Sequence, residues 1–185
     1  LCELLASRKQ PPKVLVCASA TGIYGTRGEE ILDEESHLGQ ATATGSGFLV
    51  EVGKQWEEAC KPAIDAGIRV VHARFGIILS PKGGALQKML TPAKFLGGAL
   101  GSGKQWWSWI SLDDAIGGIY HCIKSDEVDG PVNFVSPDPI QNKEFVKTLG
   151  QAISRPAIFP APAPMLRLAL GEMACLLYTS PSPRD

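Results

Sequence analysis

Three segments in the first half of the chain follow one another as strand, helix and strand, and this order restricts the fold more than any other feature. Residues 13–18 and 68–73 are short, mainly apolar runs, which is typical of strands buried inside a sheet. Between them, residues 48–60 carry apolar side chains at helical spacing. A connection that contains a helix predicts that the two strands are parallel neighbours.

Strands and helices are also predicted along the second half. We expect an amphipathic segment at 85–95, a helix from 112 to about 124, a strand at 131–135, a helix at 143–153 and a brief strand at 157–159. Ser111 and Asp114 have the spacing of a capping box, and Asn142 is expected to cap the last helix. Alternating helices and buried strands predict an α/β fold with a doubly wound parallel sheet.

Composition excludes several classes of protein. The 185 residues include 18 Lys or Arg and 19 Asp or Glu, so the net charge of −1 provides no field for a nucleic-acid backbone. With 44% hydrophobic residues the chain can build a core, while no apolar run approaches the roughly 18 residues that would suggest a membrane span. The five Cys show no C-x-x-C spacing, so we predict no metal site and a cytoplasmic protein with reduced thiols.

Both ends of the chain suggest an interior fragment. The first residue is Leu1, and the sequence starts as if inside a helix, without a signal-peptide pattern. Residues 175–185 are rich in Pro and Ser without periodicity, and they resemble a reading frame through a transposon-end adapter used in sequencing libraries. We therefore expect a non-native tail there.

Side chains with hydroxyl groups follow the first of the two predicted strands. Ligands of parallel α/β sheets bind beyond the carboxyl ends of the strands, so residues 19–24 and 74–79 should meet at one edge. Ser19, Thr21 and Tyr24 supply hydroxyls there. The alternatives are that Tyr24 packs over apolar loop neighbours and that the Ser19 hydroxyl bonds to its own turn.

Four motifs in order resemble one enzyme family. They are 19–25 (Ser-Ala-Thr-Gly-Ile-Tyr-Gly), 48–57 (Phe-Leu-Val-Glu-Val-Gly-Lys-Gln-Trp-Glu), 74–79 (Arg-Phe-Gly-Ile-Ile-Leu) with 83–85, and 107–114 (Trp-Ser-Trp-Ile-Ser-Leu-Asp-Asp). Over residues 1–174 the chain resembles an atypical, epimerase-like branch of the extended short-chain dehydrogenase/reductases. The resemblance implies the C-terminal half of a Rossmann-like domain at 1–135, a truncated substrate-side region at 136–174, and a glycine-rich loop upstream of Leu1. The implied cofactor is NADP or NAD.

The resemblance also implies site residues. Those expected to bind the cofactor are Ser19, Ala20, Phe75, Gly76, Ile77 and Ile78, and Ser19 is also expected to be catalytic. Tyr24 is the other catalytic candidate, because it is the only phenol near this edge. Typical relatives carry Tyr-x-x-x-Lys on the helix at 48–60, where the cation lowers the phenol pKa. Here Leu49 and Gly53 stand at those positions, and Lys54 is one residue off. The usual acid/base pair is therefore absent from this chain.

Two functions remain open at this point. The first is an NAD(P)-dependent oxidoreductase or epimerase-like enzyme with a small polar or sugar-like substrate. The alternative is a module that binds or senses the dinucleotide without turnover, because the fold alone does not choose between them. A third interpretation makes Trp106, Trp107 and Trp109 a protein-interaction patch, although such side chains more often pack against a neighbouring loop.

Overall fold

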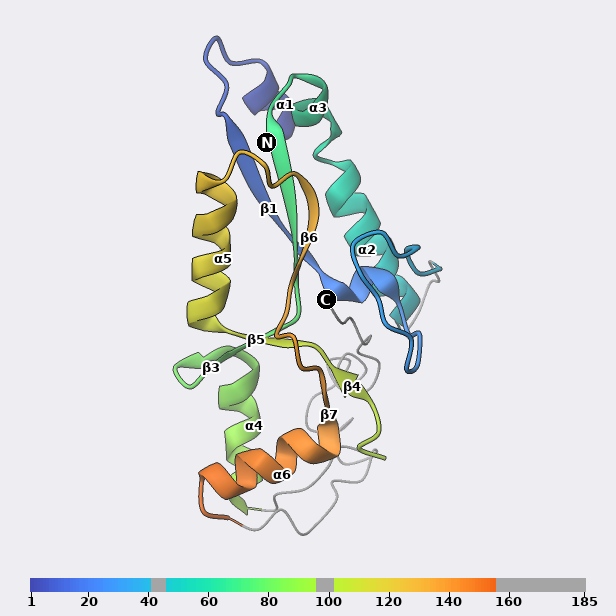
Figure 1. The fold of residues 1–185 in the computed structure, drawn as a ribbon, viewed down its shortest axis with the longest axis vertical. Helices are drawn as coiled ribbons and strands as arrows, with labels where there is room; N and C mark the ends of the chain where they lie inside the picture. The colour runs from blue at the N-terminus through green and yellow to red at the C-terminus, as the bar shows by residue number, and fades with distance from the viewer. Residues whose placement is uncertain (41–45, 96–101, 156–185) are drawn as a thin grey trace.

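The centre of the molecule is a three-stranded parallel sheet. The structure is a computed structural model, and it describes residues 1–40, 46–95 and 102–155. The strands are β1 (Val14–Ala20), β2 (Arg69–Phe75) and β6 (Gly130–Phe134), in the order β1-β2-β6 (Figure 1). β1 and β2 pair in parallel from Val14 opposite Arg69 to Ala20 opposite Phe75. The prediction that these strands are parallel neighbours is confirmed.

Helices cover both faces of this sheet. In Figure 1 the sheet runs between α5 (Leu112–Lys124) on one side and α2 (Ser46–Glu58) on the other. Two five-residue helices, α1 (Cys2–Ala6) and α3 (Lys61–Asp65), pack together near the end where β1 and β2 begin. The predicted α/β class with a parallel sheet is confirmed, because the crossover helix returns the chain to a neighbouring parallel strand.

The face of the sheet toward α5 is apolar. Side chains of alternate residues in a strand point to the same face, so Val71, Ala73 and Phe75 of β2 share this side. They join a core that also includes Ile110, which lies just before α5, and Phe134 of β6. α5 contributes Ala115, Ile119 and Cys122 to the same core. The rings of Phe75 and Phe134 lie 4.7 Å apart. Burial of this apolar surface stabilises α5 against the sheet.

The opposite face, toward α2, changes character along the strands. Near the start of β1 and β2 it is apolar, with Leu15 and Val70 packed among buried residues that follow α2. Further along, the inward positions become polar, and His72 and Arg74 are buried there at 8% and 4% exposure. This face therefore combines a small apolar core with a buried polar region at the carboxyl ends of the strands.

A second group of elements extends beyond the carboxyl edge of the sheet. It contains β3 (Ile77–Ser80) paired in parallel with β5 (Trp109–Ser111), and β4 (Trp106–Trp107) paired antiparallel with β7 (Ile140–Gln141). The helices α4 (Gly84–Phe95) and α6 (Asn142–Ala152) pack against each other beside them (Figure 1). The sequence predicted the helix at 143–153 and an amphipathic segment at 85–95, where α4 lies, but neither strand pair.

Gly76 separates β2 from β3. A Cβ atom at this position would lie 2.7 Å from the carbonyl oxygen of Ser108, so a side chain would force the backbones apart. Residues 74–79 were expected to follow the end of the second strand. In the structure β2 continues through Phe75, and a new strand starts at Ile77. The close approach at Gly76 lets the chain leave one sheet and enter the next.

The two predicted helix caps have different outcomes. Ser111 caps α5 as expected, because its Oγ accepts a hydrogen bond from the Asp114 amide at 3.0 Å. The prediction for Asn142 is wrong: Gln141 precedes α6, and Asn142 is its first residue and fully buried. The backbone N–H of Asn142 instead donates to the carbonyl of Gln105 at 2.9 Å, so this residue joins the start of α6 to the segment before β4.

The tryptophans pack inside the second group of elements. Trp107 is fully buried, and its ring centroid lies 5.1 Å from that of Phe145 on α6. Trp109 donates from its indole nitrogen to the carbonyl of Asp138 at 3.1 Å. The interpretation of an exposed interaction patch is therefore wrong for Trp107, and packing against neighbouring segments is confirmed.

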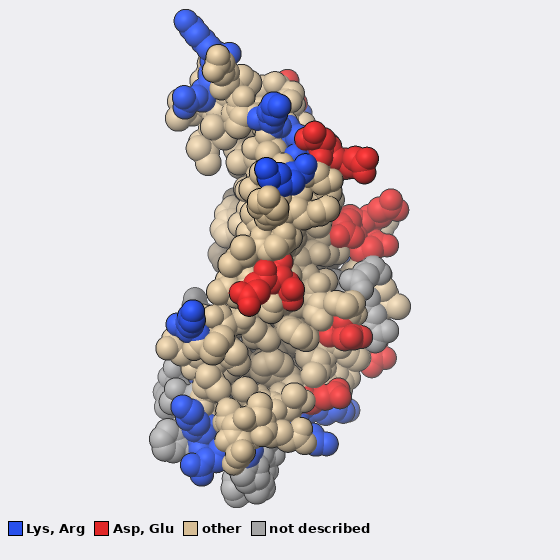
Figure 2. Space-filling view, turned by 60° about the vertical axis from the view of Figure 1, so that its left-hand side comes forward, with Lys and Arg blue, Asp and Glu red and all other residues tan. Residues whose placement is uncertain are grey.

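Charged side chains are spread unevenly over the surface. On the face shown in Figure 2, basic side chains gather near the two ends and acidic ones lie between them and along one side. In the described part of the chain, none of the helices has the length and apolar character needed to cross a bilayer. The strand predicted at 157–159, the region 160–174 and the tail at 175–185 lie outside the described residues.

Candidate functional site

The predicted site lies where β1 and β2 end side by side. Ser19 pairs with Arg74 and Ala20 pairs with Phe75, so the two strand ends do meet at one edge. However, the side chains of Ser19 and Phe75 point to opposite faces of the sheet. Ser19 donates a hydrogen bond to Glu57 of α2, whereas Phe75 packs on the α5 side against Phe134. The predicted site residues are therefore divided between two environments.

A buried ion pair occupies the α2 side of this edge. Arg74 binds Glu57 through two hydrogen bonds, from Nε to Oε1 at 2.9 Å and from Nη2 to Oε2 at 2.8 Å. The two side chains are only 5% and 14% exposed. Ser19 adds a third hydrogen bond, from its Oγ to Glu57 Oε1 at 2.8 Å. The alternative in which Ser19 bonds within its own turn is therefore wrong, because its hydroxyl reaches across to α2.

Tyr24 belongs to the same buried network. It ends the 3₁₀-helix η1 (Thr21–Tyr24) and is fully buried. Its hydroxyl accepts from Arg74 Nη1 at 2.9 Å and donates to Asn133 Oδ1 at 2.8 Å. The Arg74 guanidinium carbon also lies 5.1 Å from the centroid of the Tyr24 ring. The alternative in which the Tyr24 ring packs over apolar loop neighbours is also confirmed, because the ring shares a buried cluster with Ile23 and Leu32.

The network reaches the acidic loop through Asn133 at the end of β6. The amide of Asn133 donates to Glu34 Oε1 at 2.6 Å, which fixes the loop against the strand end. Asn133 Nδ2 is buried without a hydrogen-bond partner among the described residues. Thr21, whose hydroxyl donates to the carbonyl of Phe75 at 3.4 Å, adds a contact between η1 and β2. Three strand ends and two loops are thus held together by directional polar contacts.

The predicted site residues did not include Glu57, Arg74, Glu34 and Asn133. One signal could have pointed to the first two. Arg74 continues the mainly apolar run of β2, and a charged residue in a buried strand needs a partner of opposite charge. Glu57 falls on the buried side of the preceding helix and is the partner that the structure shows.

The environment sets the charge of each titratable group. Burial alone would raise the pKa of Glu57, but the hydrogen bonds from Arg74 and Ser19 outweigh it, so the pKa lies below its ordinary value. Burial raises the pKa of Tyr24, and the hydrogen bond and charge of Arg74 oppose part of this rise. Burial lowers the pKa of His72, and the charge of Glu57 opposes part of this fall. At neutral pH the site therefore contains a charged pair beside a neutral phenol and a neutral imidazole.

The helix face that carries Tyr-x-x-x-Lys in typical short-chain dehydrogenases is filled here. A Cβ atom at Gly53 would lie 3.0 Å from Ile23 of η1, and one at Gly22 would lie 3.6 Å from Leu49. Lys54 points elsewhere, since its Nζ donates to the carbonyl of Gly39 at 2.9 Å. The absent side chains thus allow η1 to lie directly on α2.

Gly53→Ala is expected to leave the chain about 1–3 kcal/mol less stable than Gly117→Ala does, because the methyl group added at Gly53 meets the branched Ile23 side chain. Gly117→Ala is the matched control, since Gly117 also lies within a helix but has no atom within 4 Å of a Cβ. That change should stabilise by about 0.5–1 kcal/mol. Urea unfolding measures both, and equal stabilisation by the two substitutions would contradict the contact at Gly53.

The residues predicted to bind the cofactor differ in what they can offer. Ala20 is exposed at the end of β1. The amides of Gly76 and Ile77 already donate to the carbonyls of Phe134 at 3.1 Å and Ser108 at 2.8 Å. Phe75 and Ile78 pack against the core of the α5 face. These residues can present a small apolar surface, and their role in binding stays a prediction.

Comparison with known proteins gives a consistent result. No family model matches the chain. It is 40% identical over 176 residues to the epimerase family protein YfhF of Bacillus subtilis, covering 95% of this chain and 56% of that protein. It is also 40% identical over 161 residues to the epimerase family protein Mb2239 of Mycobacterium bovis, covering 86% and 52%. The chain thus spans just over half the length of these relatives.

Solved structures show the same relationship. A nucleoside-diphosphate sugar epimerase from Corynebacterium glutamicum is 39% identical with a TM-score of 0.70, covering 91% of this chain and 36% of that one. The human epimerase family protein SDR39U1, solved with NADPH, is 28% identical with a TM-score of 0.80, covering 99% and 62%. The chain is therefore homologous to proteins named as epimerases or epimerase family proteins, and it shares their Rossmann-like α/β fold with a parallel sheet.

Proposed function

We propose that the protein containing this chain is an NAD(P)-dependent epimerase or oxidoreductase that acts on a small polar or sugar-like substrate. The observation that carries the proposal is the parallel register that brings the ends of β1 and β2 to one edge. In open α/β sheets this edge is where dinucleotides bind. The NADPH of the human relative and the name of the Corynebacterium relative support the classes of cofactor and substrate.

The proposed contacts to the cofactor fit its nicotinamide end. Ala20 leaves the end of β1 uncrowded, and Phe75 and Ile78 offer apolar surface beside a planar ring. The amides of Gly76 and Ile77 have backbone partners, so these two residues would shape the wall of the site through their main chain. The nicotinamide, when bound, supplies hydride transfer, and the protein supplies its position.

We propose Ser19 and Tyr24 as the groups nearest to the acid/base chemistry. The Tyr24 phenol is neutral, and the hydrogen bond that Arg74 donates to its oxygen opposes the rise in its pKa that burial causes. Ser19 and Arg74 both donate hydrogen bonds to Glu57 Oε1. A change in the protonation of Tyr24, which also binds Arg74, would therefore alter the hydrogen bonding of Ser19. Both hydroxyls are buried, and a substrate would have to reach them from the exposed end of β1.

A second candidate function is binding of the dinucleotide without turnover. It is favoured by the contact of α2 with η1, which fills the helix face that carries the usual acid/base pair. In this alternative the Glu57–Arg74–Tyr24 network only holds the strand ends in place. The two candidates share a binding site and differ in whether a proton leaves Tyr24.

Titration with NADPH tests the proposed site. We expect the 185-residue chain to bind NADPH measurably but more weakly than the full-length Bacillus relative. Most contacts to a pyrophosphate come from a glycine-rich strand–helix unit, and the 185 residues contain no such glycine motif after a strand. Ala20→Trp should raise the dissociation constant by about tenfold or more, equivalent to about 1.4 kcal/mol. Ala66→Trp is the control, because Ala66 is exposed at the opposite end of the sheet.

Equal effects of the two tryptophans, or no binding of NADPH or NADH by the full-length relative, would overturn the proposed site.

A second experiment distinguishes the enzyme from the sensor. The full-length protein that contains this chain is incubated with NADPH, carbonyl compounds and nucleotide sugars. Oxidation of the cofactor that depends on substrate and disappears in Tyr24→Phe supports catalysis. Tight binding with no turnover across the panel supports the sensor.

A further inference from the structure

The hydroxyl hydrogen of Tyr24 is directed at the side chain of Asn133. The Tyr24 oxygen lies 2.9 Å from Arg74 Nη1 and 2.8 Å from Asn133 Oδ1. A guanidinium group only donates hydrogen bonds, so the single hydrogen of the phenol goes to the asparagine oxygen. Tyr24 can therefore transfer this hydrogen to a substrate only after its hydrogen bond to Asn133 is broken.

The backbone of Asn133 is fixed, whereas its carboxamide has one soft torsion angle. Asn133 of β6 pairs with Arg74 of β2, and its backbone N–H donates to Glu34 Oε1 at 2.6 Å. The last torsion angle of an asparagine side chain is broad and roughly two-fold. A half-turn about this bond exchanges Oδ1 and Nδ2, and the rest of the residue stays in place.

One of the two polar atoms of this carboxamide has no partner in the observed orientation. Asn133 Nδ2 is buried and makes no hydrogen bond to the described residues. A buried N–H group without an acceptor costs free energy. The observed orientation therefore satisfies the phenol hydrogen and leaves the NH₂ group unpaired, while the rotated orientation would bring Nδ2 to the Tyr24 oxygen.

We propose that Asn133 is a positioning residue whose carboxamide rotates when Tyr24 gives up its proton. The proposal rests on the proposed function, in which Tyr24 takes part in the acid/base chemistry. In the phenol form, Oδ1 of Asn133 accepts the hydroxyl hydrogen. In the phenolate form, Nδ2 of Asn133 and Nη1 of Arg74 both donate to the Tyr24 oxygen, and such charge-assisted hydrogen bonds are stronger than neutral ones.

The rotation also determines where the proton goes. With Nδ2 and Arg74 Nη1 both donating to the Tyr24 oxygen, the hydroxyl hydrogen turns away from Asn133 and toward an acceptor at the edge of the sheet. The O–H bond of Tyr24 breaks, the proton bonds to the reacting oxygen of the substrate, and the negative charge stays on the phenolate. Return of a proton to Tyr24 reverses each of these changes.

The charged groups around Tyr24 come from three elements. They are Arg74 of β2, Glu57 of α2, which binds Arg74, and Glu34 of the acidic loop. Burial raises the pKa of Tyr24, the hydrogen bonds of Arg74 and Asn133 lower it, and the charge of Glu34 raises it. A side chain that donates to the phenolate has the effect on the pKa described for Asn133.

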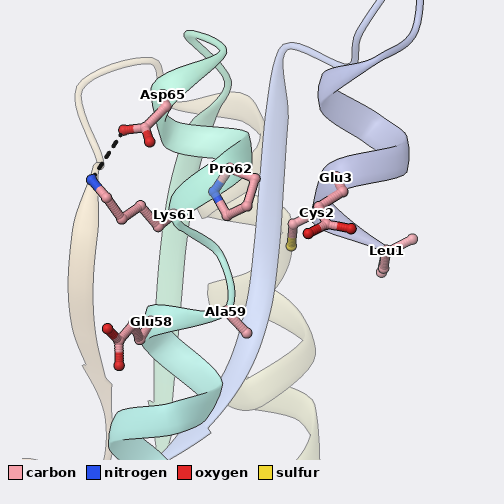
Figure 3. Close-up of a pocket in the computed structure, with 8 residues that line it drawn as sticks. All are labelled: Leu1, Cys2, Glu3, Glu58, Ala59, Lys61, Pro62 and Asp65. Atoms are coloured by element: carbon pink, nitrogen blue, oxygen red, sulfur yellow. Dashed lines mark hydrogen bonds and ion pairs between the residues drawn. The ribbon is translucent and has the colours of Figure 1, made fainter.

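Tyr24 lies in packed protein, away from a cavity of about 520 Å³. This cavity is between α1 and the segment 58–65, near the end of the sheet where β1 and β2 begin (Figure 3). Neither Tyr24 nor Asn133 lines it. Because Tyr24 is fully buried, its ionisation depends on its own hydrogen-bond partners, and the role of Asn133 can be measured without a substrate.

The test measures the acid dissociation constant of Tyr24 in the 185-residue chain without a cofactor. Fluorotyrosine replaces the three tyrosines, because its phenol is more acidic and titrates at lower pH, and fluorine NMR follows each signal. The spectrum of Tyr24→Phe identifies the Tyr24 signal, and circular dichroism gives the pH range in which the chain is folded. We expect Asn133→Leu to lower the acid dissociation constant of Tyr24 about tenfold or more, because the phenolate loses a charge-assisted donor.

The direction of the change distinguishes two roles of Asn133. A side chain that only accepts the hydroxyl hydrogen stabilises the phenol, so Asn133→Leu would then raise the acid dissociation constant. Either a rise or no change would overturn the proposal. Thr21→Val is the matched control, since it removes a buried hydrogen bond of η1 to the carbonyl of Phe75 without touching the phenol. It should leave the constant unchanged, and an equal decrease in both variants would contradict a specific role of Asn133.

A measurement on the wild-type side chain applies even if Asn133→Leu does not fold. Heteronuclear NMR of the Asn133 NH₂ group should show a transition with the same midpoint as the ionisation of Tyr24. A signal that stays constant through this ionisation would overturn the proposal. Both measurements omit the cofactor, so they are independent of the experiments on NADPH binding and turnover, whose failure would overturn the proposed function instead.

Discussion

Arg74→Met is expected to destabilise the chain by about 3–5 kcal/mol, because it leaves the Glu57 carboxylate buried without its cation. Methionine fills a similar volume, so the loss reports the unpaired charge rather than a cavity. Tyr24 also loses one of its two hydrogen bonds. Urea unfolding at neutral pH, where Glu57 is ionised, gives the change in the free energy of unfolding.

Two controls separate this effect from a general sensitivity to lost charge. Lys61→Met removes the cation of an ion pair whose partners are 70% and 60% exposed, and it should cost at most about 1 kcal/mol. The double variant Glu57→Leu with Arg74→Met removes both charges and should recover part of the loss. If Arg74→Met and Lys61→Met had the same effect, the network would not be a buried ion pair.

Trp107→Ala is expected to cost about 3–5 kcal/mol, which is the range for removing a buried large aromatic side chain. Trp107 is fully buried and packs 5.1 Å from the ring of Phe145, so its loss leaves a cavity between β4 and α6. Thermal unfolding followed by circular dichroism measures the loss.

Trp56→Ala provides the comparison for Trp107. Trp56 is 54% exposed on α2, so its removal should change stability by only about 0.5 kcal/mol. A fluorescence emission maximum at longer wavelength for Trp56 than for Trp107 would support the difference in burial independently. Equal destabilisation by both substitutions would contradict the buried position of Trp107.

The long elements of the fold could be predicted from the sequence because each carries its own periodic signal. The strand at 13–18, the helix at 48–60 and the helix from 112 are each found within a few residues of their predicted bounds. The pairs β3–β5 and β4–β7 could not be predicted, because strands of two to four residues are too short to show a period.

The two strand ends meet at one edge of the sheet as predicted, but the side chains there have neighbours that the sequence did not predict. The sequence placed Ser19 and Phe75 together because both follow a strand. The register pairs Ser19 with Arg74, and a difference of one residue turns a side chain to the other face. The contact of Tyr24 with Asn133 joins residues 109 positions apart, and no local pattern contains such information.

The unequal faces of the central sheet imply different tolerances for movement of their helices. α5 packs on apolar side chains of the sheet, and dispersion contacts change gradually when a helix slides or rotates by a small amount. α2 is attached through Glu57 to a planar guanidinium, whose paired hydrogen bonds weaken steeply when the angles change. Small adjustments of this domain should therefore be absorbed on the α5 side, while α2 and the ends of β1 and β2 shift together as one rigid piece.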